Sequence, residues 1–376
     1  MRIGVNTRLL LEGRLDGIGW FACETLRRMV ASHPEHSFYF FFDRKPSEHF
    51  IFASNVVPVV VNPPARHPVL WWLFFECGIA RALKKYKIDL FLSPDGYIPL
   101  HSKVPTVDVI HDINFAHAKN NLKPSHQWYM SHYFPLFAER ASRLVTVSEF
   151  SKKDIAETYG IPLSKISVVY NGAGDDYRPL ADADKEAVRK QYCGGSPYFI
   201  FISTILRRKN LANLLLAFDR FKAIDRLNHK LVVVGAKVWW QDELKAAYDG
   251  MSHKSDVIFI GRAEAGELSR LLASSTALVY PSFFEGFGIP IVEAFNAETA
   301  VITSNTTSMP EVAGDAALLI DPHDVDAIAE AMSKVAGDNS LRGALIGRGR
   351  VRRNDFSWDK AAARLWDVMM EALRNE

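Results

Sequence analysis

The amino-acid sequence predicts an α/β protein with two domains, each built on a parallel β-sheet whose strands are joined by helices. Two observations predict this class. The chain has 376 residues, which is too long for one ordinary hydrophobic core and suits two domains of roughly 170 to 190 residues each. Short β-branched and aromatic runs alternate with segments of helical periodicity, which is the pattern of strands joined by crossover helices.

The predicted strands follow one another at regular intervals in both halves of the chain. In the first half they cover Arg2–Asn6, Ser37–Asp43, Asn55–Val61, Asp89–Leu92, Thr106–Ile110, Arg143–Val147 and Ile166–Tyr170. In the second half they cover Tyr198–Ile202, Leu231–Val234, Val257–Ile260, Ala277–Tyr280, Ala300–Thr303 and Ala317–Ile320. In the second half each strand is followed by a polar or glycine-containing turn and then by a helix, as a doubly wound sheet requires.

The predicted domain boundary lies in the segment NGAGDDYRPLADADK, which begins at Asn171 and concentrates Gly, Asp and Pro. We expect the boundary near Arg178, which gives domains of residues 1–178 and 179–356. A last helix, residues 357–376, carries apolar residues at helical spacing after the second sheet is complete. Such a helix needs another surface to cover.

Composition and charge exclude several classes of protein. The net charge of +2 argues against the broad basic surface of a nucleic-acid binder. Cys23, Cys77 and Cys193 lack CxxC spacing, so we expect neither a disulfide framework nor a zinc site, and a reducing cytoplasm fits best. The segment MRIGVNTRLL fits a first strand better than a signal peptide. No apolar run approaches the roughly 20 residues that span a bilayer, so we expect a soluble protein, or one bound to a membrane surface.

The segment PSFFEGFGIPIVEAF, from Pro281 to Phe295, is the most informative part of the sequence. It follows an apolar strand, breaks at a glycine-containing turn and continues as a helix with Pro290 near its first turn. The N–H groups of Gly288 and Ile289 at this helix N-terminus can bind a diphosphate. Glu285 and Glu293 can accept hydrogen bonds from the vicinal hydroxyls of a sugar and of a ribose.

These two glutamates match the E-x7-E signature of the family-4 retaining glycosyltransferases, and the surrounding EGFGIPIVEA resembles the family's sequence closely. Further segments are similar to the family in their order and spacing along almost the whole chain. They are DGIGWFACETL, VIHDI, VTVSEFSKKDI, VVYNGAGDDYRPL, RRKNL and TSMPEVAGDAALLIDP.

The resemblance implies a GT-B fold, with two facing Rossmann-like domains. It implies that residues 1–178 bind the acceptor, that residues 179–356 bind the nucleotide-sugar donor, and that the helix of residues 357–376 crosses back to the N-terminal domain. The implied activity is metal-independent, retaining transfer from a UDP- or GDP-sugar to a glycan or lipid-linked acceptor, without a cofactor. The implied setting is cell-surface polysaccharide assembly in the cytoplasm, at the inner face of the membrane.

The resemblance also assigns roles to residues of the E-x7-E segment. Glu293 is expected to hold the ribose hydroxyls. Glu285 is expected to hold the transferred sugar and its phosphates, together with the backbone of Phe287, Gly288 and Ile289. A surface-exposed position for both acids is the alternative.

A group of basic residues is expected to stabilise the departing diphosphate, which gains negative charge as the glycosidic bond breaks. Arg208 and Lys209 match the basic pair of the family, and Arg207 and Arg262 are further candidates for donor binding. Many members also carry a glycine and an arginine a few residues earlier, where this chain has Ser203 and Thr204. Three solvated charges at a helix start are the alternative.

His111 ends an apolar strand and should lie at the carboxyl edge of the first sheet, where ligands of such sheets bind. The resemblance implies that it faces the transferred sugar and the acceptor and acts by orientation and hydrogen bonding; a buried structural histidine is the alternative. Gly17 and Gly19 are expected in a flexible loop that closes over the diphosphate and the acceptor, with a plain tight turn as the alternative.

The segment HPVLWWLFFECGIARALKKYK, from His67, carries Trp71, Trp72, Phe74 and Phe75 beside a cationic end. It suits a membrane-surface helix or a core helix whose charged end lies in water, and we favour the core helix. The sequence also suits two other functions. One is a GT-B enzyme of different chemistry, such as an epimerase or a phosphorylase, and the other is a nucleotide-sugar-binding partner subunit without catalysis.

Overall fold

The computed structural model describes residues 1–117, 122–225, 227–236, 240 and 242–374. The chain divides into two compact units: unit 1 comprises Met1–Asn171 and Ser357–Glu376, and unit 2 comprises Gly172–Phe356. The chain therefore enters unit 2 before the expected boundary at residue 178. The reason is that the linker already bonds to unit 2, since the Ser269 hydroxyl donates to the Asp176 carbonyl at 2.6 Å.

The part of unit 1 that the structure describes contains a seven-stranded parallel sheet. Its strands are β1 (Arg2–Asn6), β2 (Ser37–Phe42), β3 (Val56–Val60), β4 (Leu90–Ser93), β5 (Thr106–Val109), β6 (Arg143–Thr146) and β7 (Ile166–Val168). They are ordered β3-β2-β1-β4-β5-β6-β7. All seven lie where the sequence predicts them, within two residues at each end. The central strands are buried on both faces and give continuous apolar runs.

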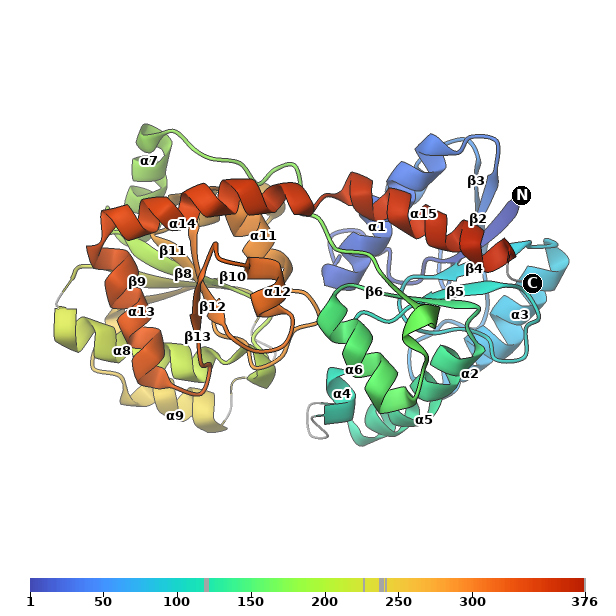
Figure 1. Ribbon diagram of the computed structural model, residues 1–376, viewed down its shortest axis with the longest axis horizontal. Coiled ribbons are helices and arrows are strands. Elements are labelled where there is room, and N and C mark those ends of the chain that lie inside the picture. Colours follow the sequence, from blue (N-terminus) through green and yellow to red (C-terminus); the bar gives the residue numbers. More distant parts are fainter. Residues whose placement is uncertain (118–121, 226, 237–239, 241, 375–376) are drawn as a thin grey trace. The chain divides into compact units, whose positions relative to one another are not determined.

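The helices of unit 1 cover both faces of this sheet (Figure 1). They are α1 (Gly17–Ser32), α2 (Pro68–Trp72), α3 (Ala80–Lys85), α4 (Asn114–His117), α5 (Pro124–Arg140), α6 (Glu149–Tyr159) and α15 (Trp358–Arg374). The helices α2, α3, α5 and α6 share one core with the sheet, while α1 and α15 pack on the other face. A π-helical stretch, Leu73–Ile79, joins α2 to α3.

The aromatic helix predicted from His67 packs mainly into this core. Phe74 and Phe75 are fully buried, which confirms the core interpretation for these two side chains. Trp71 is half-buried, whereas Trp72 is 40% exposed. Among the described residues, no helix has the length and apolar character that crossing a membrane requires.

The described part of unit 2 contains a six-stranded parallel sheet. Its strands are β8 (Tyr198–Ile202), β9 (Lys230–Val234), β10 (Val257–Gly261), β11 (Ala277–Tyr280), β12 (Ala300–Ser304) and β13 (Leu318–Ile320). They are ordered β10-β9-β8-β11-β12-β13. The two units therefore share one doubly wound strand order, with each pair of consecutive strands joined by a crossover.

The helices of unit 2 also form a layer on each face of its sheet (Figure 1). They are α7 (Asp182–Cys193), α8 (Leu211–Asp225), α9 (Asp242–Gly250), α10 (Ala265–Ser274), α11 (Ile289–Asn296), α12 (Met309–Ala313), α13 (Val325–Gly337) and α14 (Asn339–Arg352). The helices α8, α9 and α13 share one core with the sheet, and α7, α10 and α11 cover its other face.

The last helix, α15, belongs to unit 1 although the chain reaches it through unit 2. It packs along α1, and its buried face includes Trp358, Leu365 and Met369. The helix predicted over residues 357–376 therefore forms and covers the first sheet. Residues 375 and 376 lie outside the described residues.

The strand order fixes where each unit can hold a ligand. In a doubly wound sheet, ligands bind beyond the carboxyl ends of the strands at the point where the strand order reverses. That point lies between β1 and β4 in unit 1 and between β8 and β11 in unit 2. The residues that follow these four strands therefore lie where a doubly wound sheet binds its ligand.

Candidate functional site

In unit 2, β11, the turn that follows it and α11 form the strand, turn and helix that the sequence predicts. The turn ends at Gly288, which caps α11 with φ +99°, and Pro290 lies in the first turn of the helix. Glycine reaches this left-handed region without the steric cost that other residues incur. The first N–H groups of α11 therefore point from the carboxyl edge of the sheet, where they can bind an anion.

Glu285 lies buried in this turn and is held by two cations and a phenol. Its Oε1 accepts hydrogen bonds from Lys209 Nζ at 2.6 Å and from Tyr280 Oη at 2.8 Å. Its Oε2 accepts from Arg208 Nη1 at 3.0 Å. Burial by itself would raise the pKa of Glu285, but Lys209 and Arg208 outweigh it and lower that pKa to about 2. Glu285 is thus ionised, and with the two cations it forms a group of net positive charge.

The turn that carries Glu285 is fixed by further hydrogen bonds. Arg208 Nη1 donates to the Phe284 carbonyl at 3.0 Å. The Ser308 hydroxyl lies 2.9 Å from the Glu285 carbonyl and 3.1 Å from the Phe287 carbonyl. Because donors from two other segments hold it, the turn is preorganised for binding.

Glu293 lies on α11 and has a different environment from Glu285. It is partly buried and accepts a hydrogen bond from the hydroxyl of Tyr177 in the linker. Burial raises the pKa of Glu293 to about 7, although the Tyr177 hydroxyl lowers it. The two glutamates of the E-x7-E segment therefore differ in charge near neutral pH, with Glu285 fully ionised and Glu293 close to its midpoint.

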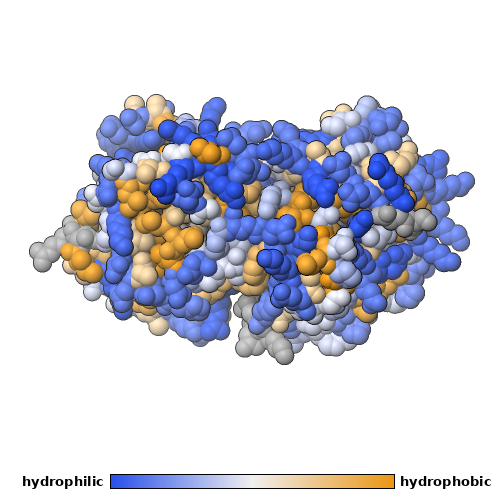
Figure 2. All heavy atoms as spheres, in the orientation of Figure 1, coloured by the Kyte–Doolittle hydropathy of each residue, from blue (hydrophilic) through white to orange (hydrophobic). Residues whose placement is uncertain are grey.

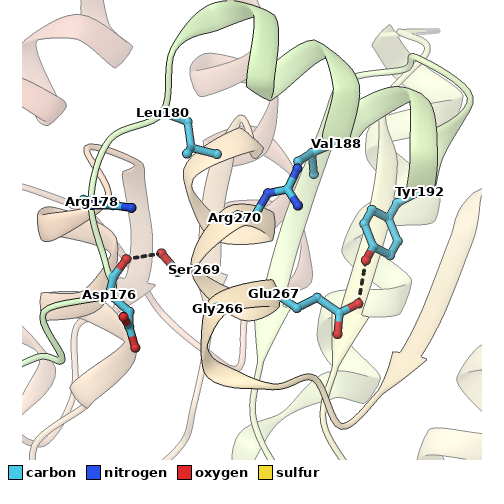
Figure 3. Close-up of a pocket in the computed structure, with 9 residues that line it drawn as sticks. All are labelled: Asp176, Arg178, Leu180, Val188, Tyr192, Gly266, Glu267, Ser269 and Arg270. Atoms are coloured by element: carbon cyan, nitrogen blue, oxygen red, sulfur yellow. Dashed lines mark hydrogen bonds between the residues drawn. The ribbon is translucent and has the colours of Figure 1, made fainter.

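A pocket of about 500 Å³ lies beside the linker that carries Tyr177, between α7 and α10 (Figure 3). Asp176 and Arg178, the two neighbours of Tyr177, line it. Figure 3 shows the hydrogen bond from Ser269 to the Asp176 backbone and the one that joins Tyr192 to Glu267 at 2.5 Å. No predicted site residue lines this pocket, and its described walls hold the linker against α10.

Two predicted donor-binding residues lie apart from Glu285. Arg207 is exposed and pairs with Glu243 of α9 at 2.7 Å. Arg262 is exposed directly after β10, an edge strand of the sheet. The described contacts of Glu285 thus include Arg208 and Lys209 and neither of these two arginines.

In unit 1, His111 follows β5 at the carboxyl edge of the sheet, as predicted. Its Nε2 lies 2.9 Å from the Pro94 carbonyl, and its ring packs edge-on against Phe21 of α1 with centroids 5.0 Å apart. Because a carbonyl only accepts, Nε2 carries the proton and Nδ1 is the accepting nitrogen. Burial lowers the pKa of His111 below its usual value, which favours the neutral ring.

The prediction for Gly17 and Gly19 is wrong in its structural part. Both residues lie in the first turn of α1 and not in a flexible loop. Asp16 caps the helix, since its Oδ1 accepts from the Gly19 N–H at 2.9 Å. A Cβ on Gly19 would lie 3.0 Å from Leu15 Cδ2 and 3.3 Å from the Leu9 carbonyl oxygen. The glycine at this position therefore permits close packing of the helix start.

The structure also places residues at these edges that the sequence patterns did not indicate. Tyr280 and Tyr177 each bond to one glutamate of the E-x7-E segment. In unit 1, Arg8 and Asp95 form a buried ion pair of 2.6 Å beyond β1 and β4. The signal available in the sequence was position. Tyr280 ends an apolar strand, Arg8 and Asp95 lie two residues beyond such strands, and Tyr177 lies inside the linker.

The sequence matches two family descriptions that together cover most of the chain. "Glycosyltransferase Family 4" matches residues 15–176, and "Glycosyl transferases group 1" matches residues 184–352. A similar protein is the O-antigen chain mannosyltransferase B of Escherichia coli. It is 32% identical over 286 residues, which are 74% of this chain and 74% of the relative.

Two solved structures resemble this one over nearly their full lengths. The sucrose-phosphate synthase of Thermosynechococcus elongatus has a TM-score of 0.82 at 15% identity, with 100% of both chains covered. The HepE protein of Anabaena, solved in complex with UDP and glucose, has a TM-score of 0.77 at 15% identity, with 99% of this chain and 100% of that chain covered. These similarities, with the two parallel-sheet units, show the GT-B fold.

Proposed function

The chain belongs to the family-4 glycosyltransferases, and from this premise we propose that it transfers a mannosyl residue from a nucleoside-diphosphate sugar to a cell-surface glycan. The observation that carries the proposal is the buried group of Glu285, Lys209 and Arg208 beside the N-terminus of α11. It combines a carboxylate for sugar hydroxyls with two cations and helix N–H groups for a diphosphate.

In the proposed reaction, the bond between the anomeric carbon and the diphosphate oxygen breaks, and the acceptor oxygen bonds to the same face of that carbon. The departing diphosphate takes the proton of the acceptor hydroxyl, and the anomeric configuration is retained. Negative charge grows on the diphosphate as it leaves. Lys209, Arg208 and the N-terminus of α11 stabilise that charge, which lowers the barrier because they are in place beforehand.

The remaining site residues divide between the two substrates in this proposal. Glu293 binds the ribose hydroxyls of the donor, and the backbone of Phe287, Gly288 and Ile289 binds the sugar phosphates. In unit 1, His111 offers Nδ1 as a hydrogen-bond acceptor to a substrate hydroxyl, since Nε2 is occupied by Pro94. Unit 1 then binds the acceptor, a glycan or a lipid-linked glycan.

The mannosyl part of the proposal rests on the similar Escherichia coli protein, whose name is that of an O-antigen chain mannosyltransferase. The HepE structure, which holds UDP and glucose, keeps a UDP-sugar donor as the alternative to a GDP-sugar. The proposed setting is the assembly of a surface polysaccharide at the cytoplasmic face of a membrane.

A thermal-shift titration with uridine, guanosine, adenosine and thymidine diphosphates tests the donor site. We expect one nucleotide to raise the melting temperature increasingly with concentration, and to do so equally with and without EDTA. Transfer from the matching radiolabelled sugar nucleotide to a lipid-linked glycan acceptor should then be insensitive to EDTA, with the anomeric configuration of the product read by NMR. Loss of transfer in EDTA, or an inverted product, contradicts the proposed chemistry.

The same experiment separates the alternatives. An epimerase converts the sugar nucleotide into an isomer without an acceptor, and a non-catalytic partner subunit gives a thermal shift without turnover. Consumption of the donor that depends on the acceptor is expected only of a transferase.

The helices α2 and α5 of unit 1 contact each other and carry exposed apolar side chains, and we propose that they bind an anionic lipid surface. The exposed apolar side chains there include Val69 and Trp72 on α2 and Trp128, which is 63% exposed, on α5. Lys123, directly before α5, is also exposed. In the view of Figure 2 hydrophilic residues predominate and apolar residues gather in smaller patches. Amphipathic surfaces with basic residues bind at the headgroup level of anionic bilayers.

We expect the protein to sediment with vesicles of phosphatidylglycerol and much less with phosphatidylcholine, and added salt should weaken the association. The double variant Trp72→Ser/Trp128→Ser should bind the anionic vesicles at least about tenfold more weakly, because each indole contributes buried apolar area. The variant Ile224→Ser is a matched control, since Ile224 is an exposed apolar residue of unit 2. Equal sedimentation of the double variant and the control excludes this surface.

A further inference from the structure

A buried polar network joins the ends of β1 and β4 at the carboxyl edge of unit 1, where the strand order reverses. Arg8, which is 9% exposed, donates from Nε to Asp95 Oδ2 at 2.6 Å. Asn6 Nδ2 donates to Asp95 Oδ1 at 2.7 Å and lies 3.0 Å from the Ser93 hydroxyl. The carboxylate of Asp95 is thus held on both oxygens.

Aromatic rings enclose the cation of this network. The Arg8 guanidinium lies 4.3 Å from the centroid of the Tyr97 ring and 5.7 Å from that of Phe75. These cation–π contacts and the Asp95 contact fix its orientation. A buried ion pair adds little net stability compared with apolar residues of the same volume, because both charges lose their hydration. Its placement at the ligand-binding edge of the sheet therefore calls for a role other than stability.

The network reaches His111 through one carbonyl group. Pro94 lies between Ser93, whose hydroxyl donates to the Tyr97 carbonyl at 2.6 Å, and Asp95. The Pro94 carbonyl accepts the proton of His111 Nε2 at 2.9 Å. Because the residues on both sides of Pro94 are held, the position of this carbonyl depends on the Arg8–Asp95 pair.

We infer that Arg8 and Asp95 are positioning residues for His111: their ion pair fixes the Pro94 carbonyl, which keeps His111 in the Nε2-protonated tautomer with Nδ1 directed to a substrate hydroxyl. Phe21 of α1 supports the ring from another side, with the two rings perpendicular and their centroids 5.0 Å apart. The positioning concerns unit 1 alone. Its catalytic consequence rests on the proposed function, in which His111 contacts the substrates.

Other charged groups near His111 do not provide the same constraint. Asp16 at the start of α1 and Asp112 after β5 act on the imidazole through their charge. Asp16 accepts a hydrogen bond from the Gly19 N–H. Asp112 accepts hydrogen bonds from the backbone and side-chain amides of Asn114. Within the described residues, the His111 ring forms its hydrogen bond with the Pro94 carbonyl, so the tautomer should depend on that carbonyl.

The double variant Arg8→Met/Asp95→Asn removes both charges and leaves no unpaired charge in the core, so it should fold. The side-chain amide introduced at position 95 still has an oxygen that can accept the hydrogen bond from Asn6. The ion pair between positions 8 and 95 is lost. The control is Lys222→Met/Asp256→Asn, which removes an ion pair of 2.9 Å from unit 2 together with the contact between Asp256 and Lys230. Arg8→Lys is a milder second variant, since it keeps the charge but loses the planar Nε contact.

The first readout is ¹⁵N NMR of histidine-labelled full-length protein, with His111 assigned by its absence in His111→Gln. We expect the Nε2-protonated tautomer in the wild type and in the control. We expect a mixture of tautomers in the double variant, and a smaller change of the same kind in Arg8→Lys. An unchanged His111 spectrum in both Arg8 variants overturns the inference.

The second readout is kinetic and tests the link to function. In the double variant kcat should fall at least about tenfold, as expected for a misdirected catalytic group, while the Kd for the nucleoside diphosphate stays within about twofold of the control. A changed spectrum with unchanged kcat leaves the positioning intact and contradicts the role of His111 in the proposed function. The NMR spectrum therefore tests the positioning of His111, and kcat tests its role in the proposed function.

Discussion

Replacing Glu293 with glutamine should make the ligand-free protein more stable at pH 8 and weaken its binding of nucleotide. The carboxyl group of Glu293 has a pKa of about 7 in the folded protein, compared with about 4.3 in an unfolded chain. Its contribution to stability is therefore fully present below about pH 4 and is lost as pH rises to 7, because the unfolded chain releases its proton first. At pH 8 the ionised, partly buried group costs at most roughly 4 kcal/mol, a cost that glutamine avoids.

Nucleotide binding should change in the opposite direction. The ionised carboxylate accepts hydrogen bonds from ribose hydroxyls better than a neutral amide, and such a bond contributes about 1.5 to 3 kcal/mol. We therefore expect the affinity of the wild type for its nucleoside diphosphate to rise with pH through about 7. That of Glu293→Gln should stay lower and should change only through ionisation of the terminal phosphate itself. Calorimetry at pH 5 and pH 8 measures both effects, and Glu330→Gln, at an exposed glutamate of α13, is the control. An equal stability gain at both pH values would falsify the assignment of this pKa to Glu293.

Tyr177→Phe supplies a sharper test of the same carboxyl group. The Tyr177 hydroxyl lowers the pKa of Glu293 by donating a hydrogen bond to it. Without that donor the midpoint of nucleotide binding should move to higher pH, with the same affinity at the alkaline limit. A uniform loss of affinity at every pH would mean that Tyr177 has a purely structural role.

The second large effect is expected for Glu285→Gln, which should lower kcat by a factor of at least about one hundred without weakening the binding of free nucleoside diphosphate. The carboxylate is needed for the sugar in transfer. Its removal, however, takes a negative charge away from Lys209 and Arg208, which lie 2.6 and 3.0 Å from it. Both cations can then attract the diphosphate more strongly.

The Glu285→Gln protein should be less stable than the wild type, and the difference should depend on pH. The pKa of Glu285 is about 2 in the folded protein and about 4.3 in an unfolded chain. Its stabilising contribution is present above the unfolded pKa and is lost as pH falls through about 2. Near pH 7 the variant should be less stable by roughly 3 kcal/mol, and saturating nucleotide should recover more of its melting temperature than it adds to the wild type. Weaker nucleotide binding in the variant contradicts this account.

The fold was largely predictable from the sequence because the central strands of both sheets are buried on both faces. Tyr198–Ile202 and Ala277–Tyr280 have the same bounds in the prediction and in the structure, since a continuous apolar run between polar turns leaves little choice of register. The error at Gly17 and Gly19 has a local cause. Two glycines near a turn suggested a loop, whereas Asp16 directly before them is a strong helix N-cap.

The candidate site was predictable only where its residues are close in sequence. Glu285 and Glu293 share one turn and helix, and Arg208 and Lys209 share a single helical turn. The residue pattern alone did not indicate which of the three neighbouring cations contact Glu285, because successive residues of that turn point in different directions. The family resemblance pointed to Arg208 and Lys209, which the structure places on Glu285. Arg8 with Asp95 and Tyr177 with Glu293 are separated by about a hundred residues along the chain, and single-sequence patterns carry no information on pairing over such distances.

The position of α15 affects the order in which the protein can fold during synthesis. Unit 2 is built from one continuous segment, Gly172–Phe356, and all its strands and helices precede the last helix. Unit 1 begins with the first residues but needs Trp358, Leu365 and Met369 of α15 to cover α1 and its sheet. On the ribosome, the unit that is translated first is therefore the last to close its core, and its apolar α1 face has to wait for the final helix.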